Sequence, residues 1–371
     1  MNKLQLSVVS ASFVFAATAF GEETDYNFES TRQRGRGNTY TAATYSHETP
    51  RWNPAVLSEA KPKTVEFRWF EFDVMVGDNS IDTVSDIMSA LGGSSDEMLG
   101  NVLDTFSDKF GKRQYLRFQL LPIGLRFGGF VLEPFVTNYE WLEMRIPTLP
   151  IMALESDTRA GMGISYGFPV GKNMKFGMTV RPTYRYFVSA DVAATDVIQI
   201  AASEAGSSDD IVSMTSGMYV PVDLGMIWSS SPSFRFGATW HNVGDAAVTE
   251  EAADTSPLIK SDLSLGMLYR KKLGSWNLDT SADLHDMLFR QSTSFLRKLH
   301  GGVEFGRPYF TADNDIGFQA GVSEGWYSLG GFVDIWLARL AVSNYGVELG
   351  EEAGQRQDRR WGATLQSSVT F

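Results

Sequence analysis

Apolar and polar side chains alternate along the last fifteen residues of the chain. One face of this segment carries Trp361, Leu365, Val369 and Phe371, and the other face is small and polar. A repeat of two residues is the side-chain period of a β-strand. Aromatic residues at both ends of the apolar face suit the two interfaces of a membrane. An edge strand of a soluble β-sandwich would alternate too, so this segment alone leaves both folds open.

The same alternation recurs along the chain, for example in 175–186, 234–241 and 276–285. A barrel in lipid and a soluble sandwich share this pattern, but the number of segments separates them. The pattern predicts fourteen strands, near 64–75, 113–123, 126–138, 158–168, 174–188, 218–230, 233–244, 258–271, 275–287, 296–307, 312–323, 326–335, 337–349 and 357–371.

Connections between these segments alternate in length. Those after even-numbered strands read as turns: Leu121-Pro122-Ile123-Gly124, 169–173, 229–232, 271–274, 307–311 and Ile335-Trp336. Several of those after odd-numbered strands are long: 76–112, 139–157, 189–217 and 245–257. Short periplasmic turns opposite longer outer loops are typical of outer-membrane barrels. We therefore predict an all-β fold, a 14-stranded antiparallel transmembrane β-barrel with both termini in the periplasm.

Two of the predicted outer loops have helical character. Apolar residues recur at three- and four-residue spacing in 82–111 and more weakly in 191–205, as they do in amphipathic helices. These helices could pack on the barrel mouth as surface structure. Alternatively, they could form a site that captures an apolar ligand.

The first twenty-one residues read as a secretory signal peptide. Lys3 supplies the positive charge, 4–20 is mostly apolar, and small residues favour cleavage near Ala19 or Gly21. Beyond this segment no run of about eighteen apolar residues follows, so we expect no membrane-spanning helix. The expected location is the outer membrane of a Gram-negative cell.

Composition excludes several functions. The formal net charge of -12 argues against nucleic acid as a partner, because phosphates attract clustered Lys and Arg. The absence of Cys excludes disulfides, zinc–thiolate sites and cysteine nucleophiles. The four histidines lack zinc-type spacing, and Asp283 and His285 share a strand face only as any alternating polar face allows. We therefore expect no enzyme activity, no catalytic residues, no metal and no cofactor.

The segment before the first strand carries specific motifs. Gly35 and Gly37 stand in a Gly-rich stretch, and Asn53-Pro54-Ala55-Val56-Leu57 follows shortly before the first strand. This arrangement resembles the N-terminal hatch of the long-chain fatty-acid transporter superfamily (FadL-like barrels). PorV-like secretion barrels and TraF-like conjugal-transfer proteins have a similar start. The resemblance implies fourteen strands and a lumenal plug, and hence a division into 1–21 (signal peptide), 22–63 (hatch) and 64–371 (barrel).

Fourteen strands enclose a lumen too wide to be filled by wall side chains alone. An N-terminal hatch could fill it and bind charges on the lumenal face. The candidates at lumenal positions are Arg181, Arg185, Arg235, Asp262, Asp279 and Asp283. Each could equally be a solvated lumen charge.

These observations favour passive uptake of hydrophobic small molecules, with fatty-acid-like compounds implied by the resemblance. The alternative is a non-transporting barrel that serves as a PorV-like secretion or TraF-like conjugation accessory. The expected partners are outer-membrane lipid, a hydrophobic ligand and the barrel assembly machinery. For the machinery, the terminal strand with Trp361, Leu365, Val369 and Phe371 resembles an assembly signal.

Overall fold

The structure is a computed structural model of the chain. It describes residues 28–43, 51–59, 64–81, 110–145, 151–193, 212–245, 259–290, 293–309, 314–335 and 337–371. No helix within these ranges is long and apolar enough to cross a membrane. The expected signal peptide and most of the two helical loop segments lie outside the described residues; of the latter, 191–193 end a strand and 110–111 form a turn.

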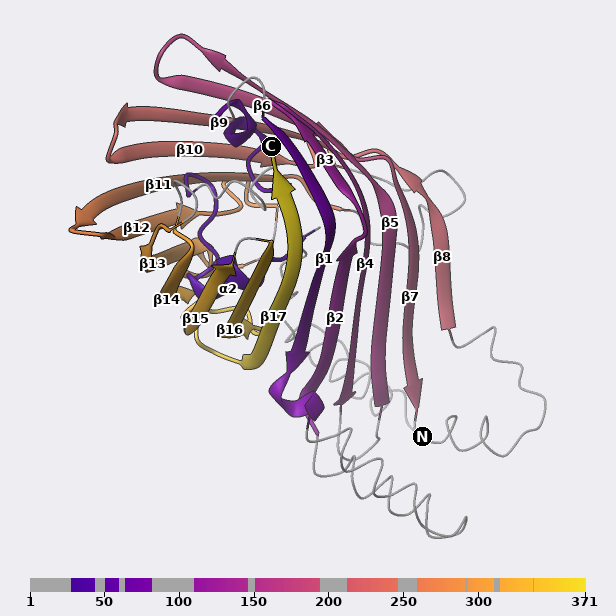
Figure 1. The fold of residues 1–371 in the computed structure, drawn as a ribbon. Coiled ribbons are helices and arrows are strands. Elements are labelled where there is room, and N and C mark those ends of the chain that lie inside the picture. Colours follow the sequence, from indigo (N-terminus) through magenta and orange to yellow (C-terminus); the bar gives the residue numbers. More distant parts are fainter. Residues whose placement is uncertain are drawn as a thin grey trace, which may run out of the picture.

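The described strands form one antiparallel sheet that closes on itself (Figure 1). Closure occurs where β1 (Val65–Gly77) pairs with β17 (Gln357–Thr370), and Val65 and Phe371 exchange backbone hydrogen bonds of 2.7 and 3.2 Å. The other strand segments are β2 (Arg113–Leu121), β3 (Gly124–Phe127), β4 (Phe130–Arg145), β5 (Ile151–Val170), β6 (Met174–Val180), β7 (Thr183–Ala193), β8 (Val212–Tyr219), β9 (Val222–Ser231), β10 (Phe234–His241), β11 (Asp262–Leu273), β12 (Trp276–Leu284), β13 (Leu299–Arg307), β14 (Ile316–Ser323), β15 (Trp326–Ile335) and β16 (Ala338–Glu348).

Three barrel strands are interrupted, so the seventeen segments make fourteen strands. Segments β2 and β3 both pair with β1 and with β4. In the same way β6 and β7 both pair with β5, and β8 and β9 continue one another along β7 and β6. The predicted fourteen-stranded antiparallel barrel is confirmed.

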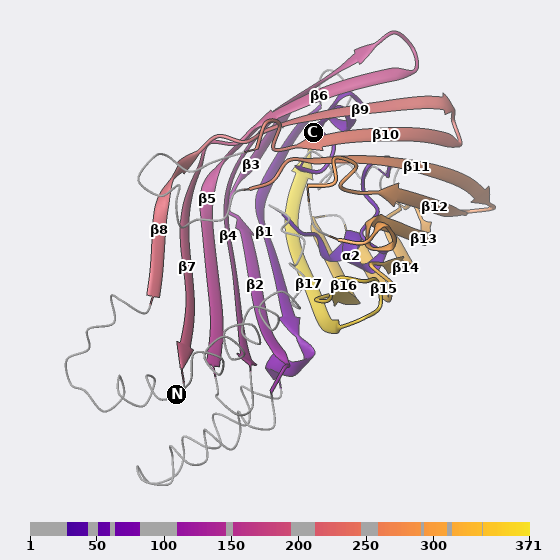
Figure 2. The same cartoon turned by 180° about the vertical axis from the view of Figure 1, so that it is seen from behind.

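Each interruption lies at a proline. Pro122, Pro182 and Pro221 each stand between two segments of one strand, and proline has no N–H for the ladder. On the neighbouring β1, the register shifts between Arg68 and Phe70. Figures 1 and 2 show the consequence: β7 and β8 run down one side of the barrel, while their continuations β6 and β9 turn away from them. The wall therefore bends at the breaks between β6 and β7 and between β8 and β9.

Two predictions about connections were wrong. Residues 121–124 do not turn the chain, because β3 continues in the direction of β2 after the break and the turn follows at Gly128 and Gly129. The predicted loop 139–157 is mostly strand, since β4 and β5 pair from Phe130–Tyr166 up to Arg145–Ile151. Both strands continue past the apolar band on which the prediction relied, so charged residues there were mistaken for a loop.

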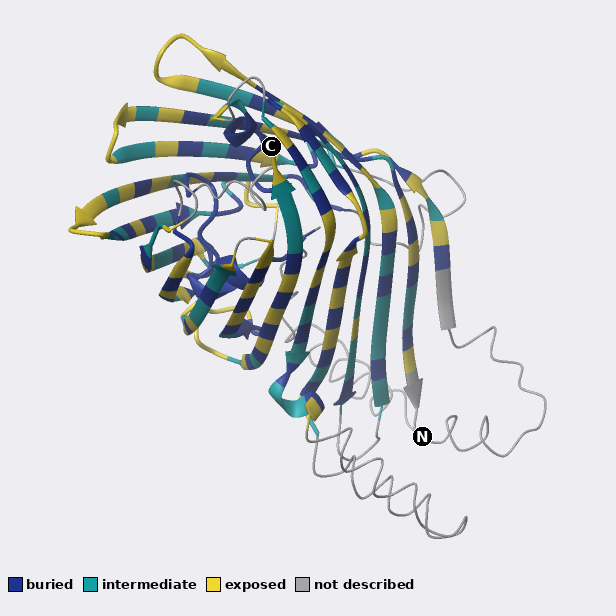
Figure 3. Cartoon of the chain, viewed as in Figure 1, coloured by how far each residue is buried: buried dark blue, intermediate teal, exposed yellow. Residues whose placement is uncertain are grey.

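Buried and exposed residues alternate along the strands of the wall (Figure 3). Along β7 and β17, Tyr184 and Trp361 are exposed, while their neighbours Thr183 and Arg360 are buried. Exposed apolar residues on the outside and buried polar residues on the inside are the arrangement that lipid outside the barrel and polar contacts within it require.

The structure gives a specific test of the assembly signal that is expected in the terminal strand. Replacing Phe371 with Asp should reduce barrel assembly strongly, because this exposed aromatic residue ends the outer face of the strand that closes the barrel. Thr370→Asp is the matched control, since Thr370 has lumenal parity. The measurement is the fraction of membrane protein that shifts on a gel between unheated and boiled samples. Equal fractions for both variants would contradict the assignment.

Candidate functional site

Residues 28–43 and 51–59, here called the hatch, make a circuit around the inner wall. The Phe28 ring packs on Phe135 of β4 with centroids 4.9 Å apart, and Thr31 Oγ1 donates to Asp73 of β1 at 3.3 Å. Helix α2 (Thr31–Gly35) then contacts β14 to β17, and the 3₁₀ helix η2 (Pro54–Glu59) contacts β5, β6 and β9. The hatch therefore contacts β1, β4 to β6, β9 and β14 to β17.

The hatch backbone approaches the wall at glycines. A Cβ on Gly237 would lie 2.1 Å from Thr41 O, and one on Gly302 would lie 2.2 Å from Arg36 O. Such distances leave room only for hydrogen, so glycine permits the contact. Glycines at these close contacts, here called the glycine belt, are Gly167, Gly177, Gly225, Gly237, Gly266, Gly302 and Gly321.

The predicted hatch motif lies against this belt. Asn53 Nδ2 donates to Thr41 O at 2.7 Å and to Met226 O of β9 at 3.2 Å, while Asn53 Oδ1 accepts from Ala55 N at 3.1 Å. One side chain thus joins both arms of the hatch to the wall. Pro54 begins η2, and its backbone faces Gly177. Gly35 faces Gly330, and Gly37, which has φ +65°, faces β13 and β14.

Buried ion pairs fix one part of the hatch beside the interrupted strand. Arg51 donates to Glu71 of β1 at 2.5 and 2.7 Å and to Glu133 of β4 at 3.3 Å. Arg68 joins Glu133 at 3.0 Å and Glu71 at 3.3 Å. The break between β2 and β3 lies between these two strands, so Arg51 connects the wall segments on either side of it. Loss of one member of such a buried network costs about 3–5 kcal/mol.

A second buried network holds α2. Arg32 Nη2 lies 2.9 Å from Glu304 Oε1 of β13, and Arg36 Nη1 lies 3.7 Å from Glu304 Oε2. Asn314 and Gln319 also donate to this carboxylate, at 2.8 and 2.7 Å. Several donors therefore satisfy the buried Glu304 carboxylate, as a charge in such a place requires.

Asp283 binds the hatch backbone directly. Its Oδ2 accepts from Tyr40 N at 2.7 Å and from Thr41 N at 2.8 Å. His285 Nε2 lies 3.6 Å from the same oxygen. The two residues do share one lumenal region, but the Asp283 carboxylate is engaged in holding the hatch. Asp283 therefore fixes residues 40 and 41 of the hatch to β12.

The other predicted lumen charges have different partners. Arg235 lies 3.1 Å from Glu59 at the end of η2, and the Arg181 guanidinium lies 5.3 Å from the Phe28 ring while it pairs with Asp223. The remaining three bind other parts of the wall or the outer loops: Arg185 binds Asp157, Asp279 binds Arg270, and Asp262 accepts from Ser264 and the backbone of Asp286.

Sequence reasoning did not single out Glu71, Glu133 or Glu304 as hatch partners. All three are charged residues on strand segments, so the polar parity of their strands was the available signal. Their partners Arg51 and Arg32 are 20, 82 and 272 residues away. No local pattern encodes such pairings.

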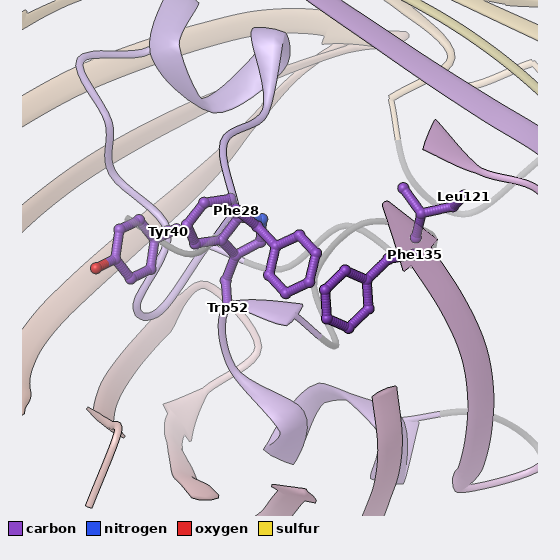
Figure 4. Packing of buried hydrophobic residues seen from close by; sticks show 5 residues of the cluster. All are labelled: Phe28, Tyr40, Trp52, Leu121 and Phe135. Atoms are coloured by element: carbon purple, nitrogen blue, oxygen red, sulfur yellow. The ribbon is translucent and has the colours of Figure 1, made fainter. Parts of the chain in front are cut away.

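Two of the apolar clusters among the described residues involve β2 and β4. The hatch cluster joins Phe28, Tyr40 and Trp52 of the hatch to Leu121 and Phe135 of the wall (Figure 4). The outer cluster consists of Met75, Tyr115, Tyr345, Val347 and Leu349, with Tyr139 and Trp141 packed against it. Strands β2 and β4 contribute to both clusters. Their register places Tyr115 opposite Trp141 in the outer cluster. Farther along it places Leu120 opposite Val136, the neighbours in sequence of Leu121 and Phe135 of the hatch cluster.

The lumenal surface of β2 and β4 thus carries apolar residues at both levels, with Arg117 and Gln119 between them, and we call these apolar residues the apolar track. Arginines lie on its rings: the Arg113 guanidinium is 4.2 Å from the Trp141 ring, and that of Arg360 is 3.3 Å from the Tyr115 ring. Within the described residues no group of three or more His, Cys, Asp or Glu could hold a metal ion.

The glycine belt generates a prediction. Gly237→Ala should displace the hatch, because the new methyl group meets the Thr41 carbonyl and overpacking costs about 1–3 kcal/mol. The hatch then closes the lumen less completely, and ion conductance in planar bilayers should rise. Gly331→Ala is the control, since its nearest contacts would be 3.7 and 3.8 Å away. Equal conductance of the two variants would argue against close seating of the hatch.

Comparison with known proteins gives similarity in structure only. No protein-family model matches the chain, and no curated protein matches it in sequence. The CymD monoaromatic hydrocarbon channel has a TM-score of 0.53 at 9% identity, over 92% of this chain and 97% of that chain. The toluene transporters TodX of Pseudomonas putida and TbuX of Ralstonia pickettii have TM-scores of 0.48 and 0.47 at 12% and 10% identity. They cover 94% and 92% of this chain, and 98% of each transporter is covered.

The similarity to CymD extends over nearly the whole of both chains. The expected FadL-like barrel is confirmed at the level of the fold. The PorV-like and TraF-like alternatives stay predictions. The chain therefore has a fourteen-stranded antiparallel β-barrel fold with the hatch inside it, and this fold is similar to that of the CymD monoaromatic hydrocarbon channel.

Proposed function

We propose that this protein lies in the outer membrane and conducts small hydrophobic molecules across it by passive diffusion. The apolar track carries this proposal. The lumen of a general porin is polar and water-filled. Here β2 and β4 place apolar and aromatic residues at two levels, in the outer half of the lumen and at the hatch, with Arg117, Gln119 and Thr137 between them.

The hatch supports the same function. Its side chains, including those of Arg32, Arg36 and Tyr40, are almost completely buried, so water and ions meet closely packed groups at this level. Apolar solutes can gain from contact with aromatic rings, whereas ions would lose their hydration there. The fold shared with CymD, a monoaromatic hydrocarbon channel, agrees with solutes of this kind. Fatty-acid-like solutes remain an expectation from the sequence motifs.

Uptake by whole cells tests the proposal. Cells that lack the protein and cells that produce it are given labelled toluene and a labelled long-chain fatty acid in parallel. We expect production of the protein to raise influx of at least one of the two over the cells without it. Equal influx of both solutes in the two strains would overturn the proposal.

The apolar track supplies a matched pair of variants. Leu121→Asn should lower influx severalfold, because it places an amide of similar size in the track, where burial of an unpaired polar group costs about 1–3 kcal/mol. Thr137→Asn puts the same amide at a neighbouring lumenal position of β4 that is already polar, and influx should stay close to that of the unmodified protein. A heat-dependent gel shift verifies that both variants fold. The same influx through both would exclude the track as the route.

A further inference from the structure

Three histidines of the described chain lie near one residue of the hatch, Tyr40: two of them contact it, and the third stacks on one of these two. The Tyr40 ring has its centroid 4.7 Å from that of His285 and 6.1 Å from that of His241. His285 in turn stacks on His300 of β13, with centroids 3.9 Å apart and an interplanar angle of 23°. The uptake path proposed above assigns no role to these imidazoles.

The rings form a continuous stack from the hatch to the wall. Trp52 lies 5.0 Å from Tyr40, and the stack continues through His285 to His300. His300 also has a hydrogen bond with the backbone of Gly37. The hatch segment from Gly37 to Thr41 therefore contacts both imidazoles, His300 through Gly37 and His285 through Tyr40.

The two imidazoles face different charges. His285 Nε2 has the Asp283 carboxylate at 3.6 Å, so one proton there is compensated. His300 Nδ1 faces the Ser323 hydroxyl at 2.9 Å, and the cations that act on it are Arg34 and Arg297. A second proton therefore places two like charges on stacked rings beside the Asp283 carboxylate, which the closed arrangement disfavours.

Neighbouring charges do not relieve this repulsion. Lys298, whose carbonyl accepts from His285 N, has its ammonium paired with Asp286. His241 Nδ1 lies 3.2 Å from the Asp223 carboxylate, which also binds Arg181, so protonated His241 has its own counterion.

A carboxylate of the hatch stays charged over the range in which histidine titrates. Burial alone would raise the pKa of Glu29, but Arg34 at 2.9 Å and Arg117 at 3.1 Å hold this pKa below its ordinary value. The contribution of these ion pairs is lost only as the pH falls through that lowered pKa. Mild acid therefore leaves the ion pairs of Glu29 in place.

We propose that the stacked His285–His300 pair is an acid-sensitive latch. With at most one proton on the pair, the ring stack holds residues 37–41 against the wall. Protonation of both imidazoles separates the rings and releases this part of the hatch, which opens the lumen to ions. The latch concerns the hatch contact alone, so ion conductance tests it whether or not the barrel carries hydrophobic solutes.

The test uses the full chain in planar bilayers at about pH 7.5 and about pH 5, on either side of the ordinary histidine pKa. The unmodified protein should conduct ions roughly tenfold more at the lower pH. His285→Phe and His300→Phe keep a ring in the stack but cannot bind a proton, so their conductance should be nearly independent of pH. His241→Phe is the control and should keep the acid response. No acid response in the unmodified protein, or a full one in both stack variants, would overturn the latch.

A disulfide provides a test that leaves the histidines in place. Thr39 Oγ1 and Ser281 Oγ of β12 are 2.6 Å apart, and the chain itself contains no Cys. In Thr39→Cys/Ser281→Cys, oxidation should tie the hatch to the wall and abolish the acid response, and reduction should restore it in the same sample. An acid response that persists in the oxidised protein would show that release of this segment is not its cause.

Discussion

The close approach of the hatch backbone to the wall is the contact on which the rest of the lumen depends. Fourteen strands leave a space that wall side chains cannot fill, and a plug must satisfy its own backbone as well as its charges. Where the glycine belt removes side chains, Thr41 and Arg36 lie against the strands. Arg51 and Arg32 can then reach carboxylates on opposite sides of the barrel. Close packing and ion pairing are thus two results of one geometry.

The proline breaks serve the same arrangement. A regular wall would continue straight through Pro122, Pro182 and Pro221, but the ladder is interrupted there and the sheet bends. Backbone groups near the breaks still find partners, since Arg181 N donates to Pro221 O at 3.0 Å. Beside the break in β2 and β3, the ion pairs of Arg51 with Glu71 and Glu133 connect the flanking strands. Hatch and bend therefore stabilise each other.

Periodicity made the barrel predictable, because each strand must place apolar residues toward lipid. The same reasoning failed at 121–124, where proline suggested a turn although the chain continues, and at 139–157, where strands extend beyond the apolar band. In the site, Asp283 could be named from its lumenal parity and does bind the hatch. The pairing of Arg32 with Glu304 could not, because it depends on how a segment folds inside a barrel that is formed 272 residues later in the chain.

Ion pairs and apolar contacts hold the hatch side by side, and they differ in how much movement they tolerate. On the β13 side the hatch is held by Arg32, Arg36 and Glu304, whose ion pairs need tight seating. On the β2 and β4 side, Phe28 meets Leu121 and Phe135 through contacts without direction, next to the ion pairs of Arg51 with Glu133 and of Arg117 with Glu29. Apolar contacts tolerate sliding and exchange of partners far better than buried ion pairs do. In the proposed uptake function, a hydrophobic solute would replace such apolar contacts locally while the ion pairs keep the hatch in place.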